Sequence, residues 1–90
     1  MSLAYAIALA EARSCLVALA DAAADIYESS HYERLLIDLD RLHPVGPALS
    51  PTIGTKDERL DRLEAAVDLM LDLGEGDALS LELLIVQALG

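Results

Sequence analysis

The sequence predicts an all-α fold: a small antiparallel four-helix bundle, completed by dimerisation, in a single domain over residues 1–90. Apolar residues recur at steps of three and four along four segments, which is the period of amphipathic helices. Helix-capping residues, glycines and prolines separate these segments. The chain is 54% apolar, but a chain of this length buries only about 60–65% of its unfolded surface. With a single cysteine, a metal or a partner subunit is left to supplement the core. The apolar first and fourth helices, described below, favour a second subunit.

The first helix is predicted over residues 3–28, with Ser2 as its N-cap. One face carries apolar residues at helical spacing, and the opposite face carries a polar stripe in which Ala18 fills a gap. The apolar stripe comprises Leu9, Leu16, Leu19, Ala23 and Ile26, and the polar one Glu11, Ser14, Asp21, Asp25 and Glu28. The opening residues 3–10 are apolar on all sides apart from the Tyr5 hydroxyl, so we expect other parts of the domain or another chain to cover them.

The second helix is predicted over residues 31–43, because Ser30 and Glu33 have the spacing of a capping box. Pro44 disfavours helical geometry in the residue before it and ends the helix. The loop 44–51 contains three prolines and a glycine and is expected to be stiff. The apolar stripe of this helix is Tyr32, Leu35, Leu36, Leu39 and Leu42, and the loop residues Val45, Leu49 and Ile53 are expected to pack back onto the bundle.

The third and fourth helices are predicted over residues 56–73 and 78–89. Thr55 and Glu58 again have capping-box spacing, Gly74 is a natural helix end, and Asp77 is the expected cap of the fourth helix. The third helix has an inner stripe of Leu60, Leu63, Val67 and Met70, and an outer acidic stripe of Asp57, Asp61, Glu64, Asp68 and Asp72.

The fourth helix is apolar on every side, and three short neighbours from the same chain enclose such a helix poorly. With the apolar start of the first helix, this predicts a homodimer. The alternative is that the fourth helix is the central core element of a monomer. The predicted interface residues are Leu3, Ile7, Leu81, Leu84, Ile85 and Leu89.

The net charge of −10 comes from 16 acidic and six basic residues. It disfavours nucleic acid and anionic membranes as partners and suits a basic protein partner. No apolar stretch at the start reaches the ~20 residues of a membrane span, and no basic residue precedes it as in a signal peptide. A lone Cys15 excludes an internal disulfide and favours a cytoplasmic setting.

Carboxylates of the third helix form one candidate catalytic site. Glu58, Asp61, Glu64 and Asp68 have the spacing found in helical Mg²⁺-dependent nucleotide hydrolases. That chemistry needs a facing set of carboxylates, but the fourth helix offers Glu82 alone, and the second only Asp38 and Asp40, one of which must point away from the other. His31 and His43 lie roughly three helical turns apart, too far to share a metal within one chain. The sequence predicts no catalytic residue, metal or cofactor.

The remaining hypotheses concern binding. The favoured one is a non-enzymatic protein–protein interaction module that presents an acidic surface to a basic partner, as an inhibitor, antitoxin-like protein or adaptor. This surface is expected to combine the outer acidic stripe of the third helix with Asp21, Asp25 and Glu28 of the first helix. The competing hypothesis is that the acidic residues only keep the bundle soluble. Besides the metal-dependent hydrolase, a further alternative is a binder of a small apolar ligand, with Met70, Leu83 and Val86 lining its pocket.

Overall fold

The computed structural model describes residues 2–42 and 54–90 and contains four helices and no strand among them. They are α1 (Leu3–Asp21), α2 (Ile26–Leu42), α3 (Lys56–Leu73) and α4 (Ala78–Leu89). The all-α prediction is therefore confirmed. The radius of gyration is 11.9 Å, close to the roughly 12 Å of a folded domain of this length.

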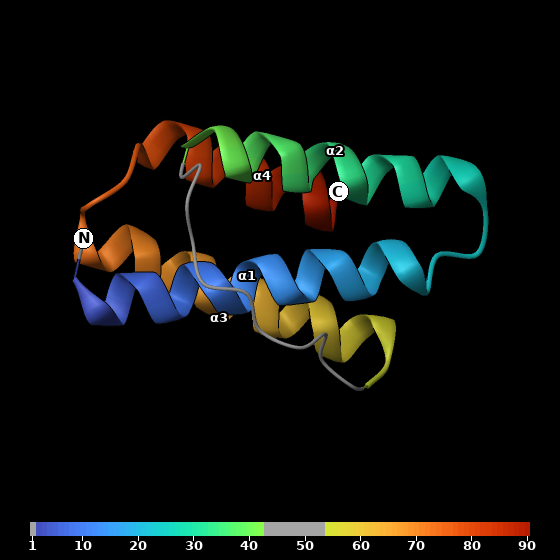
Figure 1. Cartoon of the computed structure of the whole chain (residues 1–90), viewed down its shortest axis with the longest axis horizontal. Coiled ribbons are helices and arrows are strands. Elements are labelled where there is room, and N and C mark those ends of the chain that lie inside the picture. Colours follow the sequence, from blue (N-terminus) through green and yellow to red (C-terminus); the bar gives the residue numbers. More distant parts are fainter. Residues whose placement is uncertain (1, 43–53) are drawn as a thin grey trace.

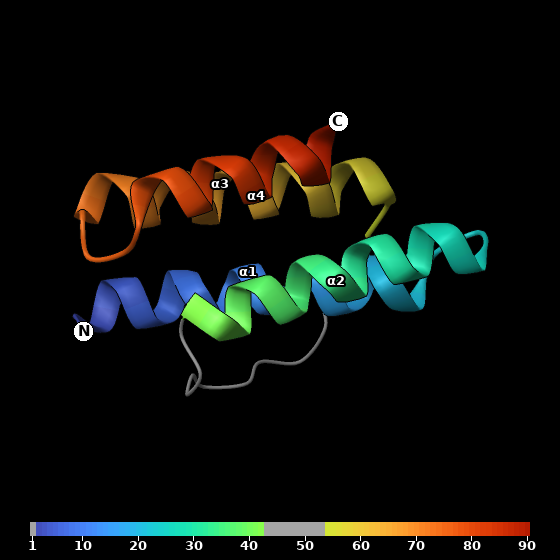
Figure 2. The ribbon, with the colours of Figure 1, turned by 90° about the horizontal axis from the view of Figure 1, so that it is seen from above.

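Each of the four helices lies beside two others. Figure 2 shows α1 beside α2 and α3 beside α4, and Figure 1 shows α1 beside α3 and α2 beside α4. Helix α1 packs against α2 and α3, and α4 packs against α3 and α2. Following the colours in Figure 1, the chain runs in one direction along α1 and α4 and in the opposite direction along α2 and α3. Helices α1 and α4 thus lie diagonally across the core.

Helix α1 is the most deeply buried element. Of its predicted apolar stripe, Leu9, Leu16 and Leu19 lie in the core, together with Cys15. Ala23 and Ile26, predicted in the same stripe, lie beyond the end of α1, and Ile26 is exposed. Ser14 and Ala18, predicted on the outer polar stripe, are also buried. That assignment was wrong because α1 has neighbours on more than one side, and its small side chains let them approach closely. The other helices supply the rest of the core, which includes Tyr32, Leu35, Leu39, Leu63, Val67 and Met70.

The boundary between the first two helices was predicted wrongly. Helix α1 ends at Asp21 rather than at residue 28, and α2 begins at Ile26 rather than at residue 31. The N-terminus of α2 is closed by Asp25, whose Oδ1 accepts from the Glu28 N–H at 2.8 Å. This hydrogen bond satisfies one of the backbone donors that a helix start leaves without an internal partner.

The predicted caps of the other three helices are confirmed. Ser2 Oγ accepts from the Tyr5 N–H, Thr55 Oγ1 from the Glu58 N–H, and Asp77 Oδ1 from the Leu79 N–H. Helix α3 ends at Gly74, which has a φ of +68°. Only glycine adopts this left-handed conformation without steric cost.

The chain start is fastened to the α3–α4 turn. The Ser2 N–H donates to Glu75 Oε1 at 2.7 Å, and the Ser2 hydroxyl donates to the other carboxylate oxygen. These hydrogen bonds lower the pKa of Glu75. The ring of Tyr5 is buried next to this turn, and a Cβ on Gly76 would come within 2.2 Å of the Tyr5 hydroxyl oxygen. Gly76 therefore allows the turn to close over Tyr5.

Some predictions concern residues outside the described ranges. They are the course of the loop 44–51, the packing of Val45, Leu49 and Ile53, and the position of His43 at a helix end. The side chain of Leu42 is also outside the description, although its backbone ends α2.

Candidate interaction surface

Helix α4 has two apolar sides, and only one of them is covered. Leu81, Leu84 and Ala88 face the core and are buried. Leu79, Leu83 and Val86 follow one another at steps of four and three, which places them on one face of the helix. All three side chains are exposed. We call Leu79, Leu83, Val86 and the adjacent exposed Leu89 the outer face of α4.

The residues predicted for a dimer interface are partly exposed and partly buried in the core of the single chain. Leu3, Ile7 and Leu89 are exposed, whereas Ile85 is partly buried against the core. Leu81 and Leu84 are core residues of the single chain, so they are unavailable to a second subunit in this fold. Leu79, Leu83 and Val86 occupy the outer positions instead. Sequence periodicity identified α4 as apolar all round, but it could not indicate which of two equivalent stripes faces the core.

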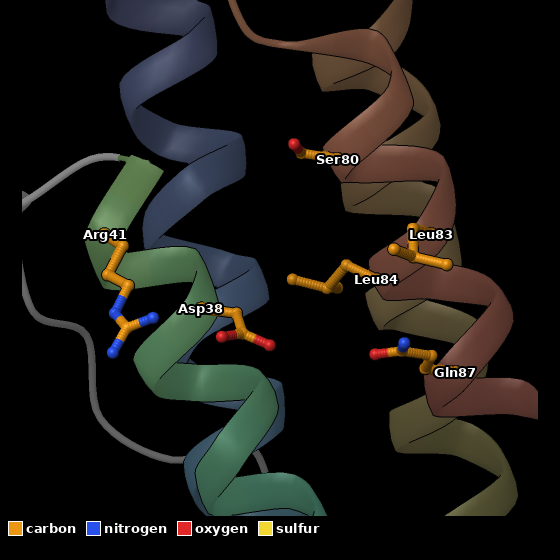
Figure 3. A pocket seen from close by; sticks show the side chains of 6 residues that line it. All are labelled: Asp38, Arg41, Ser80, Leu83, Leu84 and Gln87. Atoms are coloured by element: carbon orange, nitrogen blue, oxygen red, sulfur yellow. The ribbon is translucent and has the colours of Figure 1, made fainter.

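An open seam between α2 and α4 borders this outer face. A hollow of about 240 Å³ there has Leu84 and Leu83 on the α4 side and charged groups on the α2 side, as Figure 3 shows. A second hollow of about 310 Å³ continues it along α2. The first hollow is lined by Asp38, Arg41, Ser80, Leu83, Leu84 and Gln87, and the second by His31, Arg34, Leu35, Asp38 and Gln87.

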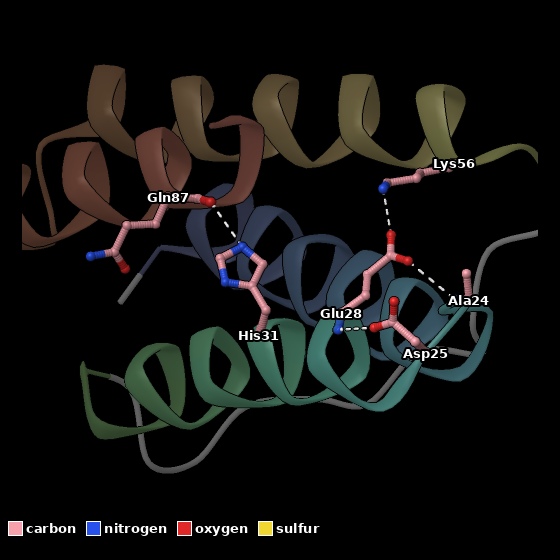
Figure 4. A network of polar contacts seen from close by, with 6 residues as sticks. All are labelled: Ala24, Asp25, Glu28, His31, Lys56 and Gln87. Carbon is pink, nitrogen blue, oxygen red and sulfur yellow. Dashed lines mark hydrogen bonds and ion pairs between the residues drawn. The ribbon is translucent and has the colours of Figure 1, made fainter.

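Polar contacts from α2 hold α3 and α4 in place (Figure 4). His31 Nε2 lies 2.9 Å from the backbone oxygen of Gln87, one of the carbonyls that the C-terminus of a helix leaves without an internal partner. Glu28 pairs with Lys56 at the start of α3 and accepts from the Ala24 N–H at 3.1 Å. On the far side, Arg13 Nε of α1 lies 2.7 Å from Asp40 Oδ1 of α2.

The Glu28–Lys56 contact changes the titration of both groups. The hydrogen bond from Lys56, followed by the one from Ala24, lowers the pKa of Glu28, and the hydrogen bond to Glu28 raises the pKa of Lys56. The Lys56 side chain is 57% exposed and the Glu28 side chain 22% exposed, so water screens the interaction. Their main role is to position the start of α3 beside α2.

The predicted acidic surface of α3 is exposed along its whole length. Its five members, named here the acidic ridge, lie on the side of α3 away from its buried residues: Asp57, Asp61, Glu64, Asp68 and Asp72. Asp25 and Glu28, expected to extend this surface from the first helix, belong to the cap of α2. Glu28 is also paired with Lys56, so it does not extend the ridge. Asp21, the third residue expected to do so, is exposed at the end of α1.

The two alternative sites are the carboxylate metal site on the third helix and the pocket for an apolar ligand. Within residues 2–42 and 54–90, no three histidine, cysteine or acidic side chains are grouped closely enough to hold a metal ion. Glu58, Asp61, Glu64 and Asp68 are all exposed on α3. The predicted apolar-ligand pocket is not formed as described, because Met70 lies in the core while Leu83 and Val86 are exposed. Leu83 instead lines the seam between α2 and α4.

By length and composition, α1 would suffice to cross a membrane. Of its most apolar stretch, 61% is buried within the fold.

Comparison with known proteins gives no match to a family model, to a curated protein or to a solved structure. The interpretation of the surface therefore depends on the geometry and chemistry described above.

Proposed function

We propose that this protein is a non-enzymatic interaction module, an antiparallel four-helix bundle that forms a homodimer through the outer face of α4. The observation that supports this proposal is the exposure of four large apolar side chains on one short helix. Leu79, Leu83, Val86 and Leu89 are 78, 57, 64 and 47% exposed. Scattered apolar residues on a surface are ordinary, but a contiguous apolar face is typical of interfaces.

The strength of such a dimer follows from the exposed fractions. Together they equal about two and a half fully exposed side chains per copy. Burying each side chain yields about 1.5–3 kcal/mol, so two copies gain roughly 8–15 kcal/mol. Association itself costs about 4–15 kcal/mol. A gain near the middle of its range, about 11–12 kcal/mol, set against a cost in the lower part of its range, about 4–6 kcal/mol, leaves a net gain of about 5–8 kcal/mol. This net gain corresponds to a dissociation constant from about 200 μM to about 1 μM.

Charge supports a second copy as the occupant of this face. Two chains of net charge −10 repel each other unless their carboxylates stay apart. Helix α4 contains a single charged residue, Glu82. The acidic ridge lies on α3, so contact through α4 brings the least charged helices together. It also leaves the ridge open to solvent in the dimer.

The acidic ridge is the second part of the proposal, as the surface that meets a basic protein in an inhibitor, antitoxin-like or adaptor role. Five carboxylates at steps of three and four along a single helix give a negative stripe that steers a basic partner. The cytoplasm is the proposed location. Reversing Asp61 and Asp68 to lysine is expected to abolish capture of a basic partner from the native host without changing the dimer.

Replacing Leu83 by aspartate tests the dimer interface. Leu83 is exposed, so this variant is expected to stay folded by circular dichroism and to sediment as a monomer at concentrations where the unmodified protein is a dimer. The matched control is Ile37→Asp, at an exposed position on α2. A Leu83→Asp variant that dimerises as well as the Ile37→Asp control would refute the proposed interface.

A further inference from the structure

The α2 side of the seam carries charges in a regular order. His31, Arg34, Asp38 and Arg41 follow at steps of three and four, so they lie along one side of α2. Arg41 is at the end of the seam near Ser80 and Leu83, and Arg34 is at the end near Gln87. Arg34 and Arg41 are exposed, and neither has an ion pair within residues 2–42 and 54–90.

Glu82 lies on the other flank of α4. At 100° per residue, Ser80 and Gln87 occupy the flank that lines the seam, and Glu82 falls on the opposite flank, across the outer face. Glu82 is exposed and has no ion pair within the described residues. The stripe of Leu79, Leu83 and Val86 therefore has α2 along one edge, where Asp38 lies between Arg34 and Arg41, and Glu82 along the other, with Leu89 beyond it.

This asymmetry distinguishes the two ways in which two α4 helices can face each other. A two-fold axis parallel to the helices keeps them parallel and exchanges their flanks. Glu82 of the second copy then lies above α2, level with residues 80–83, where Arg41 lies. A two-fold axis perpendicular to the helices makes them antiparallel and places Glu82 of the second copy on the α3 side of the first. Acidic residues outnumber basic ones on α3, so Glu82 would meet like charges there.

We infer that the two copies pack their α4 helices in parallel, each helix over the α2–α4 seam of the other, and that Glu82 of each copy pairs with Arg41 of the other. This inference rests on the proposed dimer and adds its orientation and its specificity contact. The apolar side chains of the second copy pack against Leu83 at the edge of the seam, and the Glu82 carboxylate and the Arg41 guanidinium lie at the rim of the contact.

Charge reversal tests the pairing. Glu82→Lys and Arg41→Glu each place like charges together twice in the symmetric dimer, and each is expected to raise the dissociation constant about tenfold. The double variant carries both reversals and is expected to restore the original value. Glu82→Lys also lowers the net negative charge, so general repulsion alone would predict tighter association.

The controls are Glu33→Lys on α2 and Arg62→Glu on α3, which make the same charge changes at other exposed positions. Sedimentation equilibrium measures all five variants, and thermal melting verifies that they fold. Weakening by both single changes with restoration in the double variant supports the pairing. Single variants that match their controls, or a double variant that stays weak, overturn it while the dimer itself stands. An unmodified protein that is monomeric throughout overturns the dimer and the pairing together.

Discussion

Leu83 and Leu84 are neighbours in sequence, but truncating them should have opposite consequences. Leu84 is 3% exposed, so Leu84→Ala removes buried atoms and leaves a cavity. Such changes cost about 2–5 kcal/mol. A domain of this length has an unfolding free energy of roughly 5–13 kcal/mol. Leu84→Ala therefore removes a large share of the stability of the single chain.

Leu83→Ala removes a side chain that is already 57% exposed. The buried remainder corresponds to about 0.6–1.3 kcal/mol, by the transfer free energy of a leucine. Leu83→Ala should instead weaken self-association, because that side chain belongs to the outer face and also lines the seam that the second copy covers.

Urea unfolding followed by circular dichroism, at protein concentrations well below 1 μM, measures the single chain without the contribution of the dimer. The account predicts a midpoint close to that of the unmodified protein for Leu83→Ala and a much lower one for Leu84→Ala. Equal loss of stability in both variants would show that α4 has no distinct inner and outer faces, and would refute the reasoning.

Two further predictions concern stability. Gly76→Ala brings a Cβ to within 2.2 Å of the buried Tyr5 hydroxyl oxygen, so the turn must shift and the melting temperature should fall; an unchanged melting temperature would mean that the turn does not close on Tyr5. The pKa of Glu28 is lowered in the folded state, so its contribution is present above its unfolded pKa and is lost as the pH falls through its folded pKa. Thermal melting at several acid pH values should therefore show that Glu28→Gln loses less stability on acidification than the unmodified protein does. The control Glu33→Gln should lose as much stability as the unmodified protein. Identical acid profiles for Glu28→Gln and the unmodified protein would contradict a role for the Lys56 contact.

Capping residues and periodic leucines made most of the fold predictable from the sequence. Ser2, Thr55 and Asp77 each close a helix start, because their side-chain oxygens accept from free backbone N–H groups. The inner stripe of α3 was predicted correctly, since its outer side consists of carboxylates that cannot be buried unpaired. Helices α3 and α4 consequently have the predicted bounds.

The break between α1 and α2 was not predicted, because residues 22–24 are alanines. Alanine has the highest helix propensity, so this stretch favours continuation of the first helix. The chain nevertheless turns there, and Asp25 caps the next helix while Glu28 reaches back to the Ala24 N–H. The spacing of Asp25 and Glu28 is itself a capping-box signal. It competed with Ser30 and Glu33, and only the packing of α2 on α1 distinguishes the two.

The candidate interface could be predicted at the level of the helix but not of the residue. The apolar composition of α4 indicates that one of its sides is left over, but Leu81 and Leu84 are chemically equivalent to Leu79 and Leu83. Their roles depend on how α4 is rotated against α2 and α3, which the hydrogen bond from His31 to the Gln87 carbonyl helps to fix. The spacing of apolar residues in the sequence does not determine that rotation.

The mass of the unmodified protein in solution tests the central claim most directly. Sedimentation equilibrium from low micromolar to millimolar concentration should show a reversible transition from the 9.6 kDa chain to a species of twice that mass. We predict a dissociation constant between about 1 and 200 μM from the apolar surface on α4. A mass of 9.6 kDa throughout this range would contradict self-association through α4.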